Sequence, residues 1–360
     1  MKNKKKIHIL ISGGGSGGHV FVGLSVAKYL INTGCSVTWI GAKKKIESRL
    51  IPKNKIPITY FYVSGFCGKN IFLKFVSIIK MIYASFKAKT FIKKIQPDIV
   101  FSTGGYASLP GSIASWMLSI PLVIHEQNRV PGLANFLIFK LSNCKILQAF
   151  PNTFPHSKVV GNPIRDDILH INTPEIRFQK RSGPLRLLIL GGSQGASILN
   201  DMIPSILKRL PNKFHVIHQS GSYEHIKVKN KYKQLSSNIK YKVAMFIKNI
   251  YKAYNWADLV ICRSGALTVS EIAYIGLAAL FIPYPHKDNQ QYWNAKILES
   301  VGAAKIILQN QSTKKNILKI LNSWNREKSL IMSKKSKNLK IKNATKKIVY
   351  EIYQLLNIAQ

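Results

Sequence analysis

Acidic residues are scarce in this 360-residue chain, which has 14 aspartates and glutamates against 54 lysines and arginines. The resulting formal net charge of +40 makes nucleic acid or an anionic membrane surface the obvious partners. The lysines are spread along the whole chain rather than gathered in one arm, which favours a general compositional bias. Charge alone therefore does not decide the function, and we expect no nucleic-acid partner.

Cysteines are also few, and long uninterrupted apolar segments are missing. The four cysteines are widely scattered without CxxC spacing, which favours a reducing compartment and argues against a disulfide framework or a zinc knuckle. The basic N-terminus leads into a short apolar stretch and then glycines, which does not match a signal peptide. Glycines and prolines break the longest uncharged stretch, residues 101–124, so we expect no transmembrane segment.

Short β-branched runs alternate with longer helical patterns along the whole chain. Most of these runs are nearly all apolar, as expected of parallel strands that are covered on both faces. Their alternation with helices predicts an α/β fold with doubly wound sheets. The expected strands are residues 7–11, 36–40, 99–102, 122–125, 145–148, 158–160, 185–190, 215–218, 240–243, 259–262, 279–283 and 305–308.

A coarse internal repeat indicates two domains. The segment IHILISGGGSGGH near the start is echoed by RLLILGGSQGAS at residues 186–197, and each reads as a strand, a glycine-rich turn and a helix. The chain is also longer than one hydrophobic core normally serves. We therefore expect two Rossmann-like domains with a boundary near residues 159–167, where glycine and proline punctuate the sequence.

The glycine-rich turns predict two anion-binding loops. Glycines let backbone N–H groups approach a ligand, and the helix N-terminus behind them favours negative charge, so phosphate or pyrophosphate is the default ligand. Gly13, Gly15 and Gly18 also satisfy the G-x-G-x-x-G pattern of dinucleotide oxidoreductases. That alternative requires an acid at the end of the second strand, where WIGAKKKIE offers lysines.

Seven motifs, in this order between about residues 7 and 308, closely resemble the bacterial MurG family of N-acetylglucosaminyltransferases. They are SGGHVFVGL, GGYAS, HEQNRVPG, VVGNPIR, LGGSQGASILN, CRSGALTVSEI and HKDNQQYWNA. The resemblance implies a GT-B fold, in which two Rossmann-like domains with parallel sheets face across a cleft. Residues 1–164 would form the acceptor- and membrane-facing domain and residues 165–341 the donor domain, with a C-terminal helix of about 342–360 packed back on the first.

The resemblance also implies the reaction. The family transfers N-acetylglucosamine from UDP-N-acetylglucosamine (UDP-GlcNAc) to lipid I, an undecaprenyl-diphospho-muramyl-pentapeptide. Transfer occurs with inversion, creates a β-1,4 linkage and yields lipid II for peptidoglycan. A protein of this family would lie peripherally on the cytoplasmic face of the bacterial inner membrane, an anionic surface, with other cell-wall synthesis proteins as possible partners.

Family contacts carry over residue by residue onto this sequence. Ser193 suits the donor diphosphate, Glu271 suits the ribose hydroxyls, and Ile247 would offer backbone groups to uracil. Tyr106 would line the acceptor side. The full set of donor contacts is Ser16, Gly17, Gly18, Asn128, Arg165, Ser193, Ile247, Ala266, Leu267, Thr268, Val269, Ser270, Glu271 and Gln291.

Two residues are candidates for catalysis. His19 follows the first glycine loop, and a histidine can take a proton from a hydroxyl at neutral pH, although it could instead bind phosphate or orient the loop. Glu126 and Asp288 are acids inside motifs, of which Glu126 is the stronger candidate, and either could be a structural acceptor. The chain has no D-x-D motif. We therefore expect no metal and no cofactor, with the leaving UDP stabilised by backbone N–H groups, helix dipoles and Arg165.

Residues 65–94 are a candidate membrane contact. Phe72, Phe75, Ile79, Ile82 and Phe86 recur at helical spacing, with lysines at 69, 74, 80, 87 and 89. This pattern suits docking on anionic lipid, and it also suits an amphipathic helix that packs on its own core.

Two other classes of protein remain. A UDP-N-acetylglucosamine 2-epimerase would share the donor site but should lack the acceptor motifs near Tyr106 and Glu126. A basic nucleic-acid-binding protein would explain the charge but not the two glycine loops.

Overall fold

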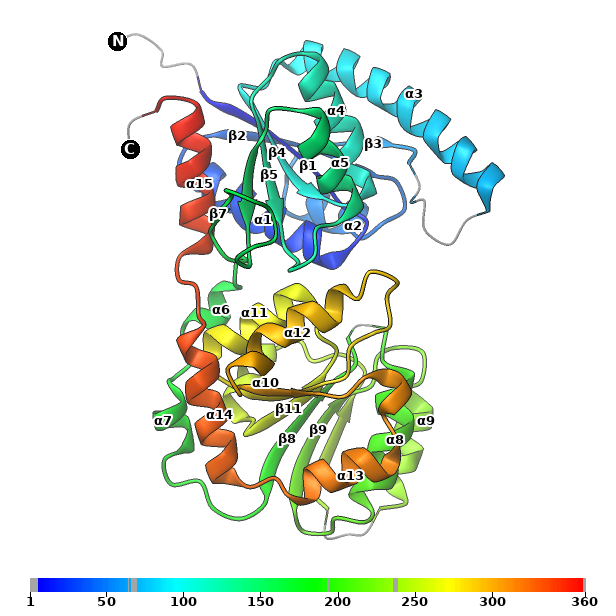
Figure 1. The fold of residues 1–360 in the computed structure, drawn as a ribbon, viewed down its shortest axis with the longest axis vertical. Helices are drawn as coiled ribbons and strands as arrows, with labels where there is room; N and C mark the ends of the chain where they lie inside the picture. Colours follow the sequence, from blue (N-terminus) through cyan, green and yellow to red (C-terminus); the bar gives the residue numbers. More distant parts are fainter. Residues whose placement is uncertain (1–5, 64, 66–69, 193, 236–238, 359–360) are drawn as a thin grey trace. The chain divides into compact units, whose positions relative to one another are not determined.

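The computed structural model describes residues 6–63, 65, 70–192, 194–235 and 239–358. The chain divides into two compact α/β units, coloured by sequence in Figure 1. The first unit is residues 1–163 with 343–360, and the second is residues 164–342. The sequence analysis placed these divisions after residues 164 and 341. Each unit is built on one parallel sheet with helices against it, as predicted.

The first unit contains a seven-stranded sheet in the order β3-β2-β1-β4-β5-β6-β7. Every neighbouring pair of strands is parallel. The strands are β1 (His8–Gly13), β2 (Ser36–Ala42), β3 (Ile58–Phe61), β4 (Ile99–Gly104), β5 (Leu122–Glu126), β6 (Lys145–Gln148) and β7 (Lys158–Val159). The helices are α1 (Gly17–Asn32), α2 (Glu47–Lys53), α3 (Ile71–Ile95), the short 3₁₀ helix η1 (Tyr106–Ser108), α4 (Leu109–Met117), α5 (Leu133–Leu141) and α15 (Ala344–Leu355).

The second unit contains a six-stranded sheet in the order β10-β9-β8-β11-β12-β13, again parallel throughout. Its strands are β8 (Leu185–Leu190), β9 (Phe214–Gln219), β10 (Tyr241–Ala244), β11 (Leu259–Cys262), β12 (Ala278–Phe281) and β13 (Ala304–Ile306). Its helices are α6 (Asp166–Leu169), α7 (Pro174–Phe178), α8 (Ser197–Leu207), α9 (His225–Lys233), α10 (Ile250–Trp256), α11 (Ala266–Ile275), α12 (Gln290–Ser300), the 3₁₀ helix η2 (Gln309–Gln311), α13 (Lys314–Asn322) and α14 (Arg326–Asn338).

The central strands are buried on both faces. In β1, Ile9, Leu10 and Ile11 have no exposed surface, and the corresponding residues of β8 are equally buried. Side chains that alternate between the two faces of a strand can all be buried only where helices cover both sides of the sheet. This is why the central strands read as continuous apolar runs in the sequence.

Strand β3 was not predicted. It pairs with β2 at the edge of the first sheet, and only its last residue, Phe61, is buried. An edge strand pairs on one side only and buries few side chains. It can therefore be short, and its sequence need not be continuously apolar. Each of the twelve predicted strands overlaps a strand of the structure.

The final helix, α15, packs against the first unit. The buried carboxylate of Glu351 forms ion pairs with Lys145 at 2.5 Å and with Lys158 at 2.6 Å. The hydroxyl of Tyr353 lies 2.8 Å from Thr33 Oγ1. Burial opposes the charge of Glu351, but the hydrogen bonds from the two lysines outweigh it and lower the pKa of this carboxyl.

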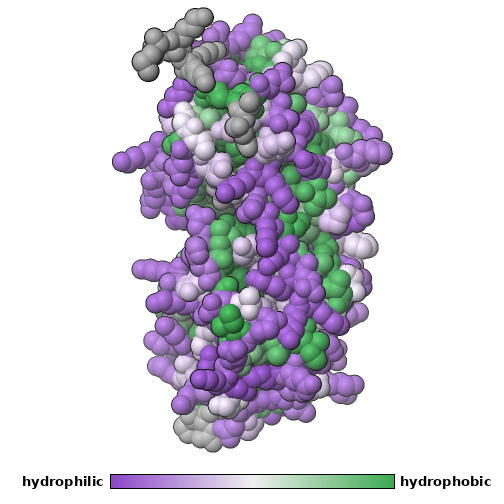
Figure 2. Space-filling model, turned by 90° about the vertical axis from the view of Figure 1, so that its left-hand side faces the viewer, coloured by the Kyte–Doolittle hydropathy of each residue, from purple (hydrophilic) through white to green (hydrophobic). Residues whose placement is uncertain are grey.

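The surface is rich in hydrophilic side chains. Figure 2 shows one face of the molecule, on which they are spread over both units rather than gathered in one patch. The three cysteines that the structure describes, Cys35, Cys144 and Cys262, are free. Within the described ranges, none of the helices combines the length and the hydropathy that crossing a bilayer requires.

Candidate functional site

The candidate residues gather at the carboxyl ends of the strands. In each sheet the strand order reverses at one point, between β1 and β4 in the first unit and between β8 and β11 in the second. Open parallel sheets bind ligands in the crevice at such a switch point. The first glycine loop follows β1, and the second follows β8, so each unit places its loop where a ligand is expected.

The first glycine loop presents His19. Ser16 precedes α1, and Gly17 and Gly18 begin its first turn, so His19 lies within one turn of the helix N-terminus. Its Nδ1 atom is 3.1 Å from the carbonyl oxygen of Gly14 and 3.0 Å from Ser16 Oγ. A carbonyl oxygen can only accept, so Nδ1 carries the proton and Nε2 carries the lone pair.

The pKa of His19 is consistent with a base at neutral pH. Burial is the largest influence and lowers this pKa, while the charges of Glu126 and Glu47 and the Gly14 carbonyl partly oppose it. The imidazole is therefore neutral at neutral pH, with Nε2 able to accept a proton.

Both carboxylate oxygens of Glu126 accept hydrogen bonds from nearby residues of the chain. Its Oε1 accepts from the backbone N–H of Asn128 at 2.9 Å and from the side-chain amide of Asn128 at 3.2 Å. Its Oε2 accepts from the N–H of Gly132 at 3.0 Å and from Asn135 Nδ2 at 2.8 Å. Four donors around a buried carboxylate favour a role in organising the loop, because a proton acceptor in the reaction would need a lone pair that faces substrate.

The neighbouring His125 is also structural. Its Nε2 lies 3.0 Å from the carbonyl oxygen of Gly161, and its Nδ1 lies 3.0 Å from the amide nitrogen of Gln127. Burial lowers the pKa of His125 to about 4. This histidine therefore stays neutral and uses both ring nitrogens within the protein.

Tyr106 lies beside the first glycine loop. A Cβ atom added to Gly15 would lie 3.0 Å from the Tyr106 ring, and one added to Gly105 would lie 2.7 Å from His19 Nδ1. Gly15 and Gly105 both have positive φ angles. The loop, Tyr106 and His19 therefore approach one another closely because the intervening residues lack side chains.

In the second unit, Glu271 forms a buried polar cluster. Its Oε1 accepts from Arg165 Nε at 2.9 Å, and its Oε2 accepts from the hydroxyl of Tyr254 at 3.1 Å. The Glu271 side chain is 8% exposed, whereas that of Arg165 is 47% exposed. Burial raises the pKa of Glu271, and Arg165 and Tyr254 act in the opposite direction. The cluster therefore holds one carboxylate in the second turn of α11, with Arg165 bound to one oxygen and Tyr254 to the other.

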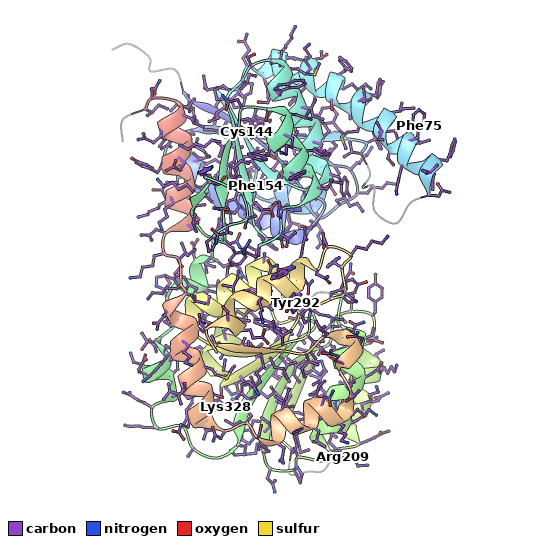
Figure 3. The ribbon with its side chains drawn as sticks, viewed as in Figure 1. Phe75, Cys144, Phe154, Arg209, Tyr292 and Lys328 are labelled. Atoms are coloured by element: carbon purple, nitrogen blue, oxygen red, sulfur yellow. The ribbon has the colours of Figure 1, made fainter. Side chains whose placement is uncertain are left out.

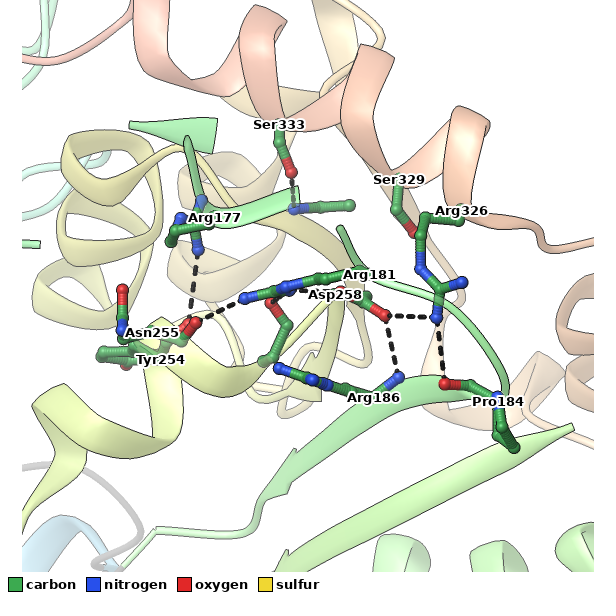
Figure 4. Close-up of polar contacts among 12 residues, drawn as sticks. Arg177, Arg181, Pro184, Arg186, Tyr254, Asn255, Asp258, Arg326, Ser329 and Ser333 are labelled. Atoms are coloured by element: carbon green, nitrogen blue, oxygen red, sulfur yellow. Dashed lines mark hydrogen bonds and ion pairs between the residues drawn. The ribbon is translucent and has the colours of Figure 1, made fainter. Parts of the chain in front are cut away.

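The position of Tyr254 depends on buried arginines (Figure 4). Arg177 donates to the carbonyl oxygens of Tyr254, Ile275 and Gly276, which joins the end of α10 to the end of α11. Burial lowers the pKa of Arg177 to about 10. Nearby, Arg181 pairs with the buried Asp258, which follows α10 and precedes β11. These contacts fix the two helices that carry Tyr254 and Glu271.

The other donor-contact candidates of the second unit lie on α11 and on loops of the same unit. Ala266 to Glu271 form the first turn and a half of α11. Val269 is fully buried in the core, so we exclude its side chain from the donor contacts that we propose. The Ile247 N–H donates to the side-chain oxygen of Gln219 at 2.9 Å, so this backbone donor is used within the protein.

Gln291 joins two of these loops. Its Oε1 accepts from the N–H groups of Ser264 and Tyr284, so it connects the ends of β11 and β12. Ser193, the candidate for the diphosphate, lies outside the described residues. The part of the chain that the structure describes contains no group of three or more His, Cys, Asp or Glu side chains that could hold a metal ion.

Comparisons with known proteins match this arrangement. The Glycosyltransferase family 28 N-terminal domain matches residues 9–144, and the Glycosyltransferase family 28 C-terminal domain matches residues 186–351. A UDP-N-acetylglucosamine--N-acetylmuramyl-(pentapeptide) pyrophosphoryl-undecaprenol N-acetylglucosamine transferase of Wigglesworthia glossinidia brevipalpis is 62% identical over 360 residues, all of both chains. The crystal structure of Acinetobacter baumannii MurG is 36% identical with a TM-score of 0.86, covering 97% of this chain and 99% of that one.

The chain belongs to the MurG family. A Buchnera aphidicola subsp. Schizaphis graminum protein with the same name as the Wigglesworthia relative is 49% identical over 99% of each chain. Membership of the MurG family confirms the predicted GT-B fold and the prediction of a glycosyltransferase. The oxidoreductase, epimerase and nucleic-acid-binding alternatives receive no support from these relatives.

Two residues of the site were missed in the sequence. Glu47 contacts the first glycine loop from α2, and Tyr254 contacts Glu271 from α10. Glu47 lies in the segment WIGAKKKIE, where the lysines drew attention instead. Tyr254 carries no local signal, because its contact depends on how α10 and α11 pack.

Proposed function

We propose that this protein transfers N-acetylglucosamine from UDP-GlcNAc to lipid I and so forms lipid II for peptidoglycan. The observation that carries the proposal is full-length identity of 62% with a relative named for that transfer. The second unit holds the donor, with Glu271 on the ribose, Ile247 on uracil and Arg165 near the diphosphate. The first unit takes the acceptor beside Tyr106.

The proposed chemistry is a single displacement. Nε2 of His19 takes the proton of the acceptor hydroxyl as its oxygen bonds to the anomeric carbon of the sugar. The bond from that carbon to the UDP oxygen breaks, and UDP leaves with the electron pair. One in-line step inverts the anomeric centre to a β-1,4 linkage and needs one base and no covalent intermediate. The N–H groups at the starts of α1 and α11 and the cation of Arg165 stabilise the departing phosphate.

Transfer of labelled N-acetylglucosamine to a lipid I analogue tests the function directly. We expect sustained transfer by the wild-type protein in the presence of excess EDTA, since the residues proposed to stabilise UDP include no metal ligand. Omission of the lipid I analogue is the control for hydrolysis of the donor. Binding of UDP-GlcNAc without transfer would mean that the protein catalyses another reaction. Loss of transfer with EDTA would contradict metal independence.

We further propose that α3 docks the protein on the anionic cytoplasmic face of the inner membrane. The opposite side of α3 packs on the core through Met81, Ala84 and Ala88. Phe72 is 70% exposed and Phe75 is 61% exposed, and Figure 3 shows Phe75 directed away from the ribbon. All five apolar residues of the predicted contact are exposed, with lysines between them. Apolar side chains next to lysines are typical of a helix that lies in the interface of an anionic bilayer.

Replacing two of these aromatic side chains should weaken membrane binding. A Phe72→Ser, Phe75→Ser variant loses two apolar groups, each worth about 1.5–3 kcal/mol when fully buried, so binding to vesicles should fall at least about tenfold. Co-sedimentation with phosphatidylglycerol vesicles measures this change, and added salt should weaken the binding of both proteins. The control variant Tyr223→Ser, Ile226→Ser removes two apolar groups of the second unit that are even more exposed, and it should leave binding unchanged. Equal binding by wild type and the Phe72, Phe75 variant would exclude α3 as the docking surface.

A further inference from the structure

Glu47 is a buried acid that the proposed reaction does not use. It is the first residue of α2, and its side chain has no exposed surface. The carboxylate accepts from the N–H of Gly15, which lies 3.1 Å from both oxygens, and from the N–H of Ala42, 3.1 Å from Oε1. An ionised carboxylate is buried at high cost unless such donors surround it, so its place beneath the glycine loop requires an explanation.

One peptide group joins Glu47 to His19. The N–H of Gly15 donates to Glu47, and the carbonyl oxygen of Gly14 accepts from His19 Nδ1. This N–H and this carbonyl belong to the same planar peptide unit, whose two ends are conjugated. A hydrogen bond at the N–H end polarises the carbonyl end, so bonds in series strengthen one another.

We propose that Glu47 is a positioning residue for His19, acting through the Gly14–Gly15 peptide. It holds the imidazole as the Nδ1–H tautomer, with Nε2 directed to the acceptor hydroxyl, and it stabilises the imidazolium formed when Nε2 takes the proton. No proton crosses the peptide. The arrangement serves the purpose of the aspartate in a Ser-His-Asp triad, with a peptide group between acid and imidazole. The inference rests on the proposed role of His19 as the base.

The packing around the loop fits this role. A Cβ atom added to Gly14 would lie 2.2 Å from Glu47 Oε1, and one added to Gly41 would lie 2.9 Å from Glu47 Cγ. Both glycines therefore make room for the carboxylate. Dinucleotide-binding proteins use the N–H groups of such a loop for phosphate, whereas here the N–H of Gly15 donates to an internal anion.

Other ionisable groups also lie around His19, but their hydrogen bonds do not lead to its Nδ1 through the Gly14–Gly15 peptide. Glu126 and His125 interact with His19 electrostatically from β5, and the Tyr106 ring of η1 lies against Gly15 of the same loop. Glu126 raises the pKa of His19 by charge, but its hydrogen bonds go to Asn128, Gly132 and Asn135. Glu47 also raises the pKa of His19. Removal of its charge must therefore lower that pKa, which moves the acidic limb of the rate profile to lower pH.

Nitrogen-15 NMR of the His19 ring, together with the pH dependence of transfer, tests the proposal. The wild-type protein should show the Nδ1–H tautomer. Glu47→Gln keeps the shape of the side chain without its charge, and it should weaken the tautomer preference and lower the pKa of His19. Carboxylates that orient metal-ligating histidines typically contribute about 10- to 100-fold, and by analogy we expect a loss of that order in kcat, with affinity for UDP unchanged.

Glu351→Gln is the matched control, because it neutralises another buried carboxylate of the first unit without touching the loop. It should leave the His19 tautomer, the acidic limb and kcat unchanged. If Glu47→Gln does not fold, Glu47→Asp, which withdraws the carboxylate by one methylene, is measured in the same way. An Nε2–H tautomer in wild type, or an unchanged tautomer and acidic limb in the variants, would overturn the proposal. Absence of transfer by the wild-type protein would instead refute the proposed function, and the ring spectra would still report on Glu47.

Discussion

Replacement of His19 by glutamine is expected to lower kcat by about 10²- to 10⁴-fold, the usual contribution of a positioned general base. Glutamine preserves a hydrogen-bond donor near the Gly14 carbonyl but offers no nitrogen that can accept a proton at neutral pH. The acceptor hydroxyl would then have to lose its proton to water. Transfer to a lipid I analogue under saturating donor and acceptor measures the loss.

The binding of UDP separates the base from the alternative roles of His19. The contacts proposed for uridine, Ile247 and Glu271, belong to the second unit, so His19→Gln should bind UDP with wild-type affinity. A phosphate-binding histidine would instead raise the Kd for UDP along with the loss of rate. His156→Asn alters an exposed histidine of the first unit and should retain full kcat. Full activity of His19→Gln with lipid I would exclude His19 as the general base.

Most of the fold could be predicted from the sequence because burial on both faces dictates composition. The strands at the centre of each sheet must be largely apolar, so β1 and β8 are visible as short runs of isoleucine and leucine. The glycine turns are equally visible, because a strand, a turn and a helix in that order repeat once in the chain. Strand β3 was not predicted because it lies at an edge of the sheet, where burial does not require a continuous apolar pattern.

The sites were less predictable, because the roles of acids depend on contacts between distant segments. Glu126 lies in a motif and was predicted as a possible base, yet donors from the following loop and from α5 occupy both of its oxygens. Glu47 lies among lysines and attracted none, yet it contacts the loop of His19 across 32 positions of the chain. Sequence patterns show which residue types are present, whereas the direction of a carboxylate is decided by tertiary packing.

Replacement of Glu271 by glutamine is expected to weaken UDP binding by about 10- to 100-fold, the equivalent of one hydrogen bond to a charged group at about 1.5–3 kcal/mol. The carboxylate can accept from ribose hydroxyls, and it is held by Tyr254 on one oxygen and by Arg165 on the other. Arg165 is half exposed. When a ribose hydroxyl replaces it as the donor to Glu271, the guanidinium can turn toward the diphosphate. Calorimetric titration with UDP measures the loss.

The pH dependence of UDP binding should follow the same carboxylate. Burial raises the pKa of Glu271, so it protonates at a higher pH than an ordinary glutamate, and affinity for UDP should fall as the pH decreases through that raised pKa. In Glu271→Gln this dependence should disappear. Glu299→Gln neutralises another acid of the second unit, one that pairs with Lys296, and should keep the wild-type affinity and pH profile.

A ligand that lacks one hydroxyl identifies what Glu271 binds. Wild-type protein should bind 2′-deoxy-UDP more weakly than UDP, whereas Glu271→Gln should distinguish the two much less. The two losses are then non-additive, as expected when both remove one interaction. Additive losses would mean that Glu271 acts elsewhere, on the packing of α10 against α11 through Tyr254. In that case Tyr254→Phe would reproduce the whole effect of Glu271→Gln, whereas a direct contact with ribose predicts a smaller loss, because Tyr254 only orients the carboxylate.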